Sequence, residues 1–278
     1  MVRAIRCCLK SNFHTMLRAP STWMLLAYVT LLADLYARGI RRFCAEVEES
    51  ATGVYFVLFI NNPYRAMLFV IGIFMLFLNI PFISNTSDYE IPRMGRRRWL
   101  AGQTVYLLTA SGWYVMASEI ICALLLLPRL KLSLEWGRVF TTLARTSAGT
   151  TFAFGLNLDY GVFSRFAGGE AVFWNYVITT GVCFFFANLL FTLHLWAGRL
   201  LAFCITGVGI LLPVLTDVLG GGMRYILSPL SWVQFSRVDR IMTYAIPSLG
   251  FVMAALFLGN ILLFVLNIIR IRRFEWKR

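Results

Sequence analysis

Six segments of about 20 mostly apolar residues occur along this chain of 278 residues, and they restrict its fold more than any other feature. A helix needs about 20 such residues to cross the roughly 30 Å hydrocarbon core of a bilayer. Lipid offers no hydrogen bonds to the backbone, so each crossing segment is predicted to be a helix. The expected spans are residues 21–37, 65–84, 100–127, 171–196, 200–219 and 245–269. The predicted fold is therefore an all-α polytopic membrane protein with six transmembrane helices in a single domain, residues 1–278.

Composition agrees with a membrane protein and excludes most soluble classes. Hydrophobic residues make up 59% of the chain and charged residues only 14%, against about 25% charged in ordinary soluble domains. A soluble chain of this length cannot bury so much apolar surface in one core. We therefore exclude a disordered protein, a disulfide scaffold and almost any soluble enzyme.

The distribution of positive charge predicts the orientation. Lys and Arg number 26 against 13 Asp and Glu. With six spans, the side that holds both termini has short loops dense in basic residues, whereas the other side spreads its basic residues over longer loops. Since cytoplasmic loops are enriched in Lys and Arg, we expect both termini in the cytoplasm and the chain in the cytoplasmic (inner) cell membrane. Anionic lipids account for the excess charge, so no nucleic-acid partner is expected.

The first twenty residues are predicted to form an amphipathic interface helix along the inner leaflet. Basic side chains lie toward one face, and apolar side chains at helical spacing form the other. A simple anchor without further function is the alternative interpretation. The basic residues are Arg3, Arg6 and Lys10, and the apolar residues are Ile5, Leu9, Phe13, Met16 and Leu17.

The loop between the second and third spans places two acids and a proline before a basic run that leads into a helix. We expect a short polar helix with a turn at Gly95, projecting into the cytosol. Its mixed charge favours docking on a soluble partner, whereas the arginines alone would only stop translocation and bind lipid. The docking residues expected here are Asp88, Tyr89, Glu90, Arg93, Gly95, Arg96, Arg97 and Arg98.

Together these features resemble the permease subunit of a type-2 ABC transporter, the class built around ABC-2 membrane domains. The resemblance covers essentially the whole chain and includes the amphipathic first helix and the six spans with both ends inside. The run Arg-x-Gly-Arg-Arg-Arg-Trp-Leu-x-Gly-Gln at 93–103 is similar to the family's coupling helix and the start of its third span. The connection 219–247 is similar to its two short external re-entrant helices. The outer loops 38–64 and 128–170 are longer than those of its leanest members.

The resemblance implies ATP-driven export of an amphipathic substrate: a peptide, or a lipid-like or drug-like molecule. This chain carries no Gly-x-x-x-x-Gly-Lys-Ser/Thr phosphate loop. ATP and Mg are therefore expected on a separate ABC ATPase subunit, and no cofactor, metal or catalytic residue is expected in this chain. One six-span unit does not readily enclose a pathway, which implies a second permease copy or a paralogue.

Polar residues inside the spans are candidates for a substrate pathway, because a mid-bilayer charge costs about 2.5–3.5 kcal/mol. Glu119 in the third span is the clearest case, with Trp113, Asn188 and Asn260 as further candidates. The alternative is structural: a protonated or hydrogen-bonded Glu119 and asparagines that join helices.

The outer loops are expected to be basic, with a surface helix at 134–145 and an exposed Cys44. Asp34 is placed to pair with Arg38 one helical turn later.

Two other functional classes stay open. A membrane-embedded enzyme, such as a protease or lipid transferase, is one alternative. Only His14 and His194 are available as imidazole ligands for metal chemistry. A non-transporting immunity or assembly factor is the other.

Overall fold

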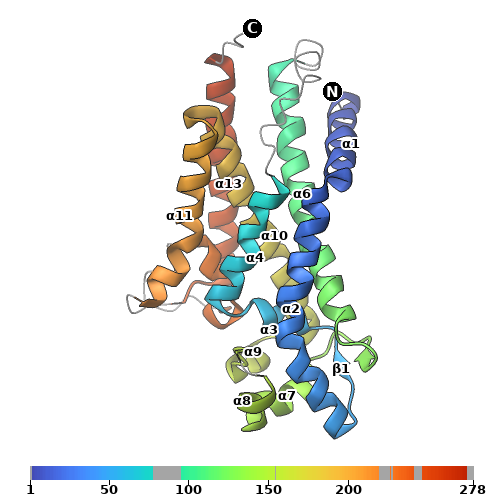
Figure 1. Ribbon diagram of the computed structural model, residues 1–278. Coiled ribbons are helices and arrows are strands. Elements are labelled where there is room, and N and C mark those ends of the chain that lie inside the picture. Colours follow the sequence, from blue (N-terminus) through green and yellow to red (C-terminus); the bar gives the residue numbers. More distant parts are fainter. Residues whose placement is uncertain are drawn as a thin grey trace.

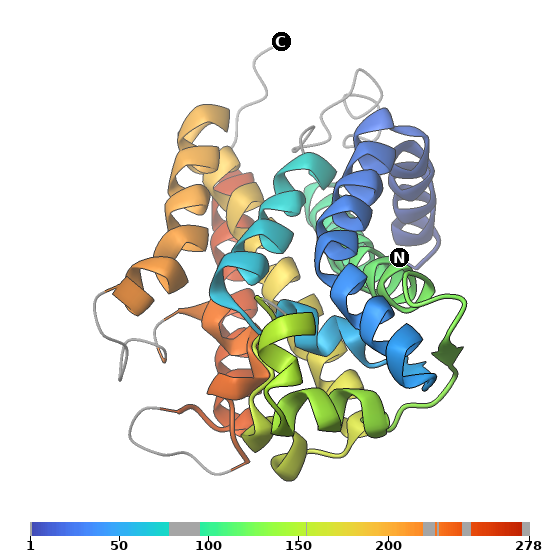
Figure 2. The ribbon, with the colours of Figure 1, turned by 60° about the horizontal axis from the view of Figure 1, so that its bottom comes forward.

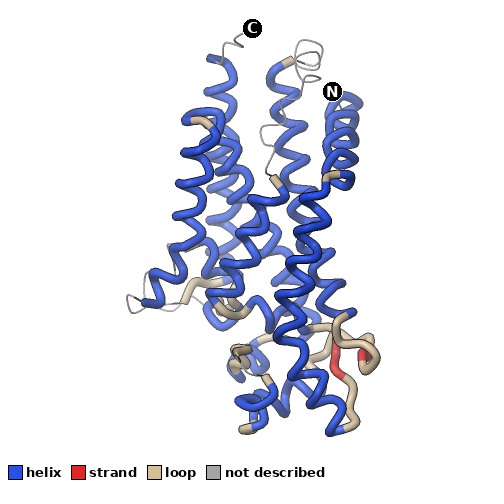
Figure 3. Tube along the Cα trace, in the orientation of Figure 1, coloured by secondary structure: helices blue, strands red, loops and turns tan. Residues whose placement is uncertain are grey.

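A computed structural model describes residues 2–77, 95–153, 155–218, 226, 228–240 and 246–273. The chain is mostly helical (Figure 3). Four helices are long and apolar enough to cross a membrane, which supports the expected membrane-protein character. They are α2 (Pro20–Val47), α6 (Arg96–Leu124), α10 (Gly168–Ala197) and α13 (Leu249–Arg273).

Two further apolar helices correspond to the second and fifth expected spans. They are α4 (Pro63–Leu76) and α11 (Arg199–Val218), which pack against each other. Asn62 caps the start of α4 by accepting hydrogen bonds from the backbone N–H groups of Tyr64 and Arg65. The helix ends at Leu76, and the part of the expected second span from residue 78 onward lies outside the described residues.

The longer helices form a bundle and run roughly along one axis (Figure 1). Helices that follow one another in the sequence run in opposite directions, in the order α2, α4, α6, α10, α11 and α13. The start of α6, the turn between α10 and α11 and the end of α13 lie at the upper end in this view. We call this the arginine end, because α6 begins there with the exposed residues Arg96, Arg97 and Arg98. A small subdomain covers the opposite end; we call it the outer subdomain, because it contains most of the loops that the sequence predicts to be outer. It contains α7 (Gly137–Arg145), α8 (Ala148–Phe152), α9 (Tyr160–Arg165) and the parallel strands β1 (Ala51–Thr52) and β2 (Leu130–Lys131).

The expected first helix is present as α1 (Val2–Arg18). It ends because Ala19 has an extended ψ of 129° before Pro20 starts α2, and α1 is inclined to α2 (Figure 2). A Cβ added at Gly102 of α6 would lie 3.1 Å from the Cys8 sulfur, so the two backbones approach closely. Much of the buried face of α1 therefore rests on α6.

The expected outer loop 38–64 is largely helical and buried. Helix α2 runs on to Val47, and Cys44 in its last turn is buried, which corrects the expected exposure of that thiol. All six residues of α3 (Tyr55–Ile60) are buried as well. This helix is apolar on every face, which suits its position surrounded by other parts of the protein.

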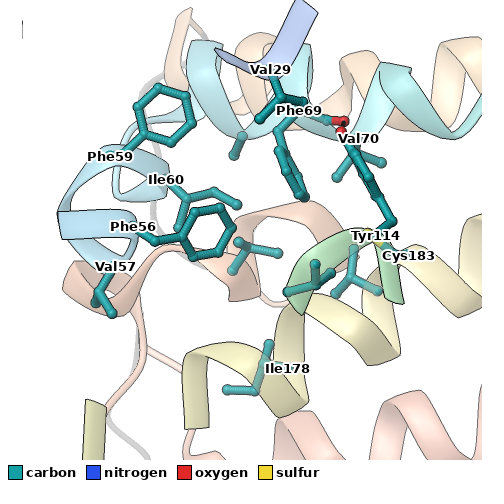
Figure 4. Close-up of a cluster of buried hydrophobic side chains, with 14 of the residues drawn as sticks. Val29, Phe56, Val57, Phe59, Ile60, Phe69, Val70, Tyr114, Ile178 and Cys183 are labelled. Carbon is teal, nitrogen blue, oxygen red and sulfur yellow. Dashed lines mark hydrogen bonds between the residues drawn. The ribbon is translucent and has the colours of Figure 1, made fainter. Parts of the chain in front are cut away.

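Helix α3 forms a cluster with α4 and α6 (Figure 4). Phe56 meets Phe69 edge to face, and Phe69 stacks on Tyr114 with ring centroids 4.6 Å apart. The Tyr114 hydroxyl donates to the Phe69 carbonyl at 2.9 Å. This cluster anchors the short α3 between two longer helices.

The expected surface helix at 134–145 is present as α7, and Trp136 before it donates to the Phe166 carbonyl at 2.7 Å. In the connection before α13, the described residues form two short 3₁₀ helices, η1 (Pro229–Val233) and η2 (Phe235–Arg237). Trp232 and Phe235 are buried there. Residues 219–225, 227 and 241–245 of that connection lie outside the described part.

Candidate functional site

The arginine end is built by the first turn of α6. Gly95 has φ +82°, a conformation that favours glycine, and its carbonyl accepts from the backbone N–H groups of Arg98 and Trp99, both at 3.1 Å. The three arginines are exposed while Trp99 is fully buried, so the helix is held firmly just beneath them. The other expected docking residues, Asp88, Tyr89, Glu90 and Arg93, lie outside the described residues.

An apolar groove of about 600 Å³ runs between α6, α10 and α13. Pockets for small ligands commonly measure about 300–1,000 Å³. The groove opens toward the side of the bundle, where Leu108 and Phe257 are exposed on its rims. Its lining residues are Ala101, Thr104, Val105 and Leu108 of α6; Tyr176, Val177, Thr180, Gly181 and Phe184 of α10; and Met253, Leu256, Phe257, Asn260, Ile261 and Phe264 of α13.

Three of the four polar side chains on the lining turn toward backbone carbonyls, whereas the buried Thr180 hydroxyl has no partner among the described residues. Thr104 donates to the Leu100 carbonyl at 3.0 Å, and Tyr176 to the Gly112 carbonyl at 3.4 Å. Asn260 donates to the carbonyl of Leu256 at 2.9 Å. Because these three groups are already hydrogen-bonded and most other lining residues are apolar, the groove presents a mainly hydrocarbon surface to an occupant.

Asn188 of α10 contacts the lining residue Asn260 of α13 at the back of the groove. Asn188 donates to the Asn260 side-chain oxygen at 3.4 Å and accepts from Asn267 at 3.3 Å. These bonds join α10 to α13, and inter-helix hydrogen bonds of this kind contribute about 0.6 kcal/mol each. The arrangement matches the structural interpretation of the asparagines and also fixes one wall of the groove.

Glu119 and Trp113 do not join the asparagines. Glu119 follows Leu108 by eleven residues on the same face of α6, which places it about 16 Å farther along the helix. It is half-buried, and none of the described residues donates to its buried Oε1. Trp113 meets Phe13 of α1 with ring centroids 6.3 Å apart. The four candidate pathway residues therefore occupy three separate places.

The outer subdomain balances much of its positive charge internally. Asp34 accepts from Arg38 at 2.8 Å, as its spacing indicates, and also from Arg41 at 2.6 Å. Four further ion pairs lie at this end of the bundle, one of which joins Arg165 to Asp159 at 3.6 Å within the described residues. The other three join Arg165 to Asp239 at 3.2 Å, Arg240 to Glu170 at 2.7 Å and Arg138 to Glu49 at 3.5 Å.

Arg65, at the start of α4, is only 2% exposed and was not among the residues expected to matter. Its guanidinium donates to the carbonyls of Phe59 and Gly155 and lies 4.6 Å from the centroid of the Tyr36 ring. It therefore ties α3, α4 and the loop before α9 together beneath the outer subdomain. The sequence feature that could have indicated Arg65 is an arginine in the first turn of an otherwise apolar helix.

Among the described residues, no group of three or more His, Cys, Asp or Glu side chains is placed to hold a metal ion. Comparison of the chain with family models, with curated proteins and with solved structures finds no match in any of the three.

Proposed function

We propose that this chain is the transmembrane subunit of an ATP-driven exporter of the type-2 ABC class. It moves an amphipathic substrate across the membrane with energy from ATP hydrolysis on a separate ATPase subunit. The observation that supports this best is the course of α6. The helix starts at three exposed arginines, is 29 residues long and forms one wall of the apolar groove.

In this proposal α6 is the mechanical link. A partner that holds the arginine end moves the first turn of α6, and a continuous helix carries the displacement to Ala101, Val105 and Leu108. These residues face α10 and α13 across the groove, whose other walls are joined by the asparagine contacts. Movement of α6 against that pair changes the width of the groove and its access from the membrane.

The remaining parts of the proposal concern assembly and topology. Helices α4 and α11 act as the second and fifth of six crossings. The protein lies in the inner membrane, with both termini in the cytoplasm. The loop that contains Asp88, Tyr89, Glu90 and Arg93 docks on the ATPase together with Gly95 and the three arginines. A second copy or a paralogue of this chain completes the pathway.

Copurification and ATPase measurements test the proposal. The tagged full-length chain is purified from its host membranes, and we expect an ATP-binding partner of about 25–35 kDa, the size of a single nucleotide-binding domain with its extensions. We expect its hydrolysis in liposomes to depend on this chain. Changing Arg96, Arg97 and Arg98 together to glutamine is expected to abolish that dependence.

A matched control is Arg42→Gln, which removes one exposed charge from the opposite end of the bundle. It is expected to leave coupled hydrolysis unchanged. Turnover of a lipid or peptide by the isolated chain without nucleotide would contradict the proposal and favour a membrane-embedded enzyme. Binding without either activity would favour an immunity or assembly factor.

A further inference from the structure

The groove face of α6 continues upward to a basic residue. Arg97 precedes the lining residues Ala101, Thr104, Val105 and Leu108 by four, seven, eight and eleven positions. Residues at these spacings lie on one face of an α-helix. Arg97 is exposed, so its guanidinium is available above the groove on the side from which the groove is lined.

The neighbouring arginine at position 96 lies on a different face. Leu100 and Gln103 follow it by four and seven positions, and both are buried in the face of α6 that meets the rest of the bundle. Arg96 and Arg97 therefore share a helical turn and a charge but differ in their position relative to the groove. This difference provides an internal control for any ligand of the groove.

The length of this face matches one leaflet of a bilayer. Eleven residues separate Arg97 from Leu108, which corresponds to about 16 Å at 1.5 Å per residue. Half of the hydrocarbon core is about 15 Å thick. A lipid with its headgroup beside Arg97 would thus place its acyl chain along the full length of the groove.

We infer that the groove between α6, α10 and α13 is a binding site for an anionic phospholipid from the leaflet at the arginine end. One acyl chain lies in the groove, and the headgroup phosphate pairs with Arg97. The hydrocarbon surface of the lining favours the chain, and the positive charge above it selects a negatively charged headgroup over a neutral one. This inference does not rest on the proposed transport function, because it concerns a lipid bound to the chain at rest.

Native mass spectrometry of the purified full-length chain tests the site. The protein is titrated with phosphatidylglycerol and with phosphatidylcholine of the same acyl chains, in the absence of nucleotide. We expect one phosphatidylglycerol to bind at least about fivefold more tightly than phosphatidylcholine, since one arginine near an anionic surface contributes a factor of about that size. Arg97→Gln is expected to remove this preference, whereas Arg96→Gln is expected to keep it.

A second pair of variants tests the position of the acyl chain. Val105→Trp fills the centre of the groove from a rim that is 37% exposed, and Ile120→Trp adds the same bulk at a site on α6 that is 52% exposed and outside the groove. Val105→Trp is expected to weaken both lipids by about tenfold, because at least two methylenes lose their burial. Ile120→Trp is expected to bind as the unaltered chain does.

Three results would overturn the inference. They are equal binding of the two lipids, equal losses in Arg96→Gln and Arg97→Gln, or unchanged binding in Val105→Trp. Gel filtration identifies any variant that does not fold, and Leu108→Trp then replaces Val105→Trp, since Leu108 is 45% exposed and tolerates a larger side chain. An intact ATPase response with no lipid preference would reject this site alone.

Discussion

The buried side chain of Arg65 connects the helix bundle to the outer subdomain. Replacing it with leucine leaves the buried carbonyl of Phe59 and the part-buried carbonyl of Gly155 without this donor. Hydrogen bonds to a charged group contribute about 1.5–3 kcal/mol each, so Arg65→Leu is expected to lower the free energy of unfolding by about 3 kcal/mol or more. Chemical unfolding of the purified protein in detergent measures this change.

Two companion variants separate the charge from its geometry. Arg65→Lys keeps the positive charge but lacks the planar fork that serves two carbonyls at once, so an intermediate loss is expected. Arg42→Leu removes an exposed arginine from α2 and is expected to stay within about 0.5 kcal/mol of the unaltered protein. Equal losses at Arg65 and Arg42 would show that the buried contacts carry no net stability.

At the residue scale, contacts between near neighbours in the sequence were predictable and distant ones were not. The pair of Asp34 and Arg38 followed from their four-residue spacing on a helix. Asn188 and Asn260 were recognised as polar residues in apolar spans, but no local rule pairs residues 72 positions apart. Arg65 reaches a carbonyl 90 residues away, which only the assembled subdomain brings near.

At the scale of elements, the contact between α2 and α8 is unusually close. A Cβ added at Gly39 would lie 1.7 Å from the carbonyl oxygen of Phe152, so Gly39→Ala forces the two helices apart. Overpacking of this kind costs about 1–3 kcal/mol. We expect a lower unfolding free energy and faster proteolysis within residues 146–153.

Gly250→Ala is the control for this substitution. An added Cβ at Gly250 in α13 meets nothing within 4 Å, and alanine is the better helix former by about 1 kcal/mol or less. The variant is expected to be neutral or slightly more stable. A loss of similar size in both variants would mean that the α2–α8 contact is not specifically responsible.

Elements were predictable where length and apolarity coincide. The long helices α6, α10 and α13 lie where apolar runs of span length occur, within a few residues at each end. The end of α2 was missed because its last ten residues carry three arginines and a glutamate, although the outer subdomain buries one side of them. Helix α3 was missed because six apolar residues are too few for a span, and only their surroundings make them helical.

At the scale of the whole molecule, the arrangement depends on whether α4 crosses the membrane. The described helix has 14 residues, which corresponds to about 21 Å, and the hydrocarbon core is about 30 Å thick. If α2, α4 and α6 all cross, Lys10 and Arg138 face opposite sides of the membrane. If α4 returns without crossing, they face the same side.

Cysteine labelling distinguishes these topologies. Lys10→Cys, Arg98→Cys and Arg138→Cys are made singly in a chain whose own cysteines are replaced by alanine; all three positions are exposed. With three crossings and a cytoplasmic amino terminus, a membrane-impermeant maleimide labels only Arg138→Cys in intact cells. The other two react after the membrane is opened.

Labelling of Arg98→Cys in intact cells would contradict the proposed ATPase contact, because a nucleotide-binding partner is available only from the cytoplasm. Labelling of Lys10→Cys and Arg138→Cys on one side would instead reduce α4 to a re-entrant helix, and the six-span arrangement would fail.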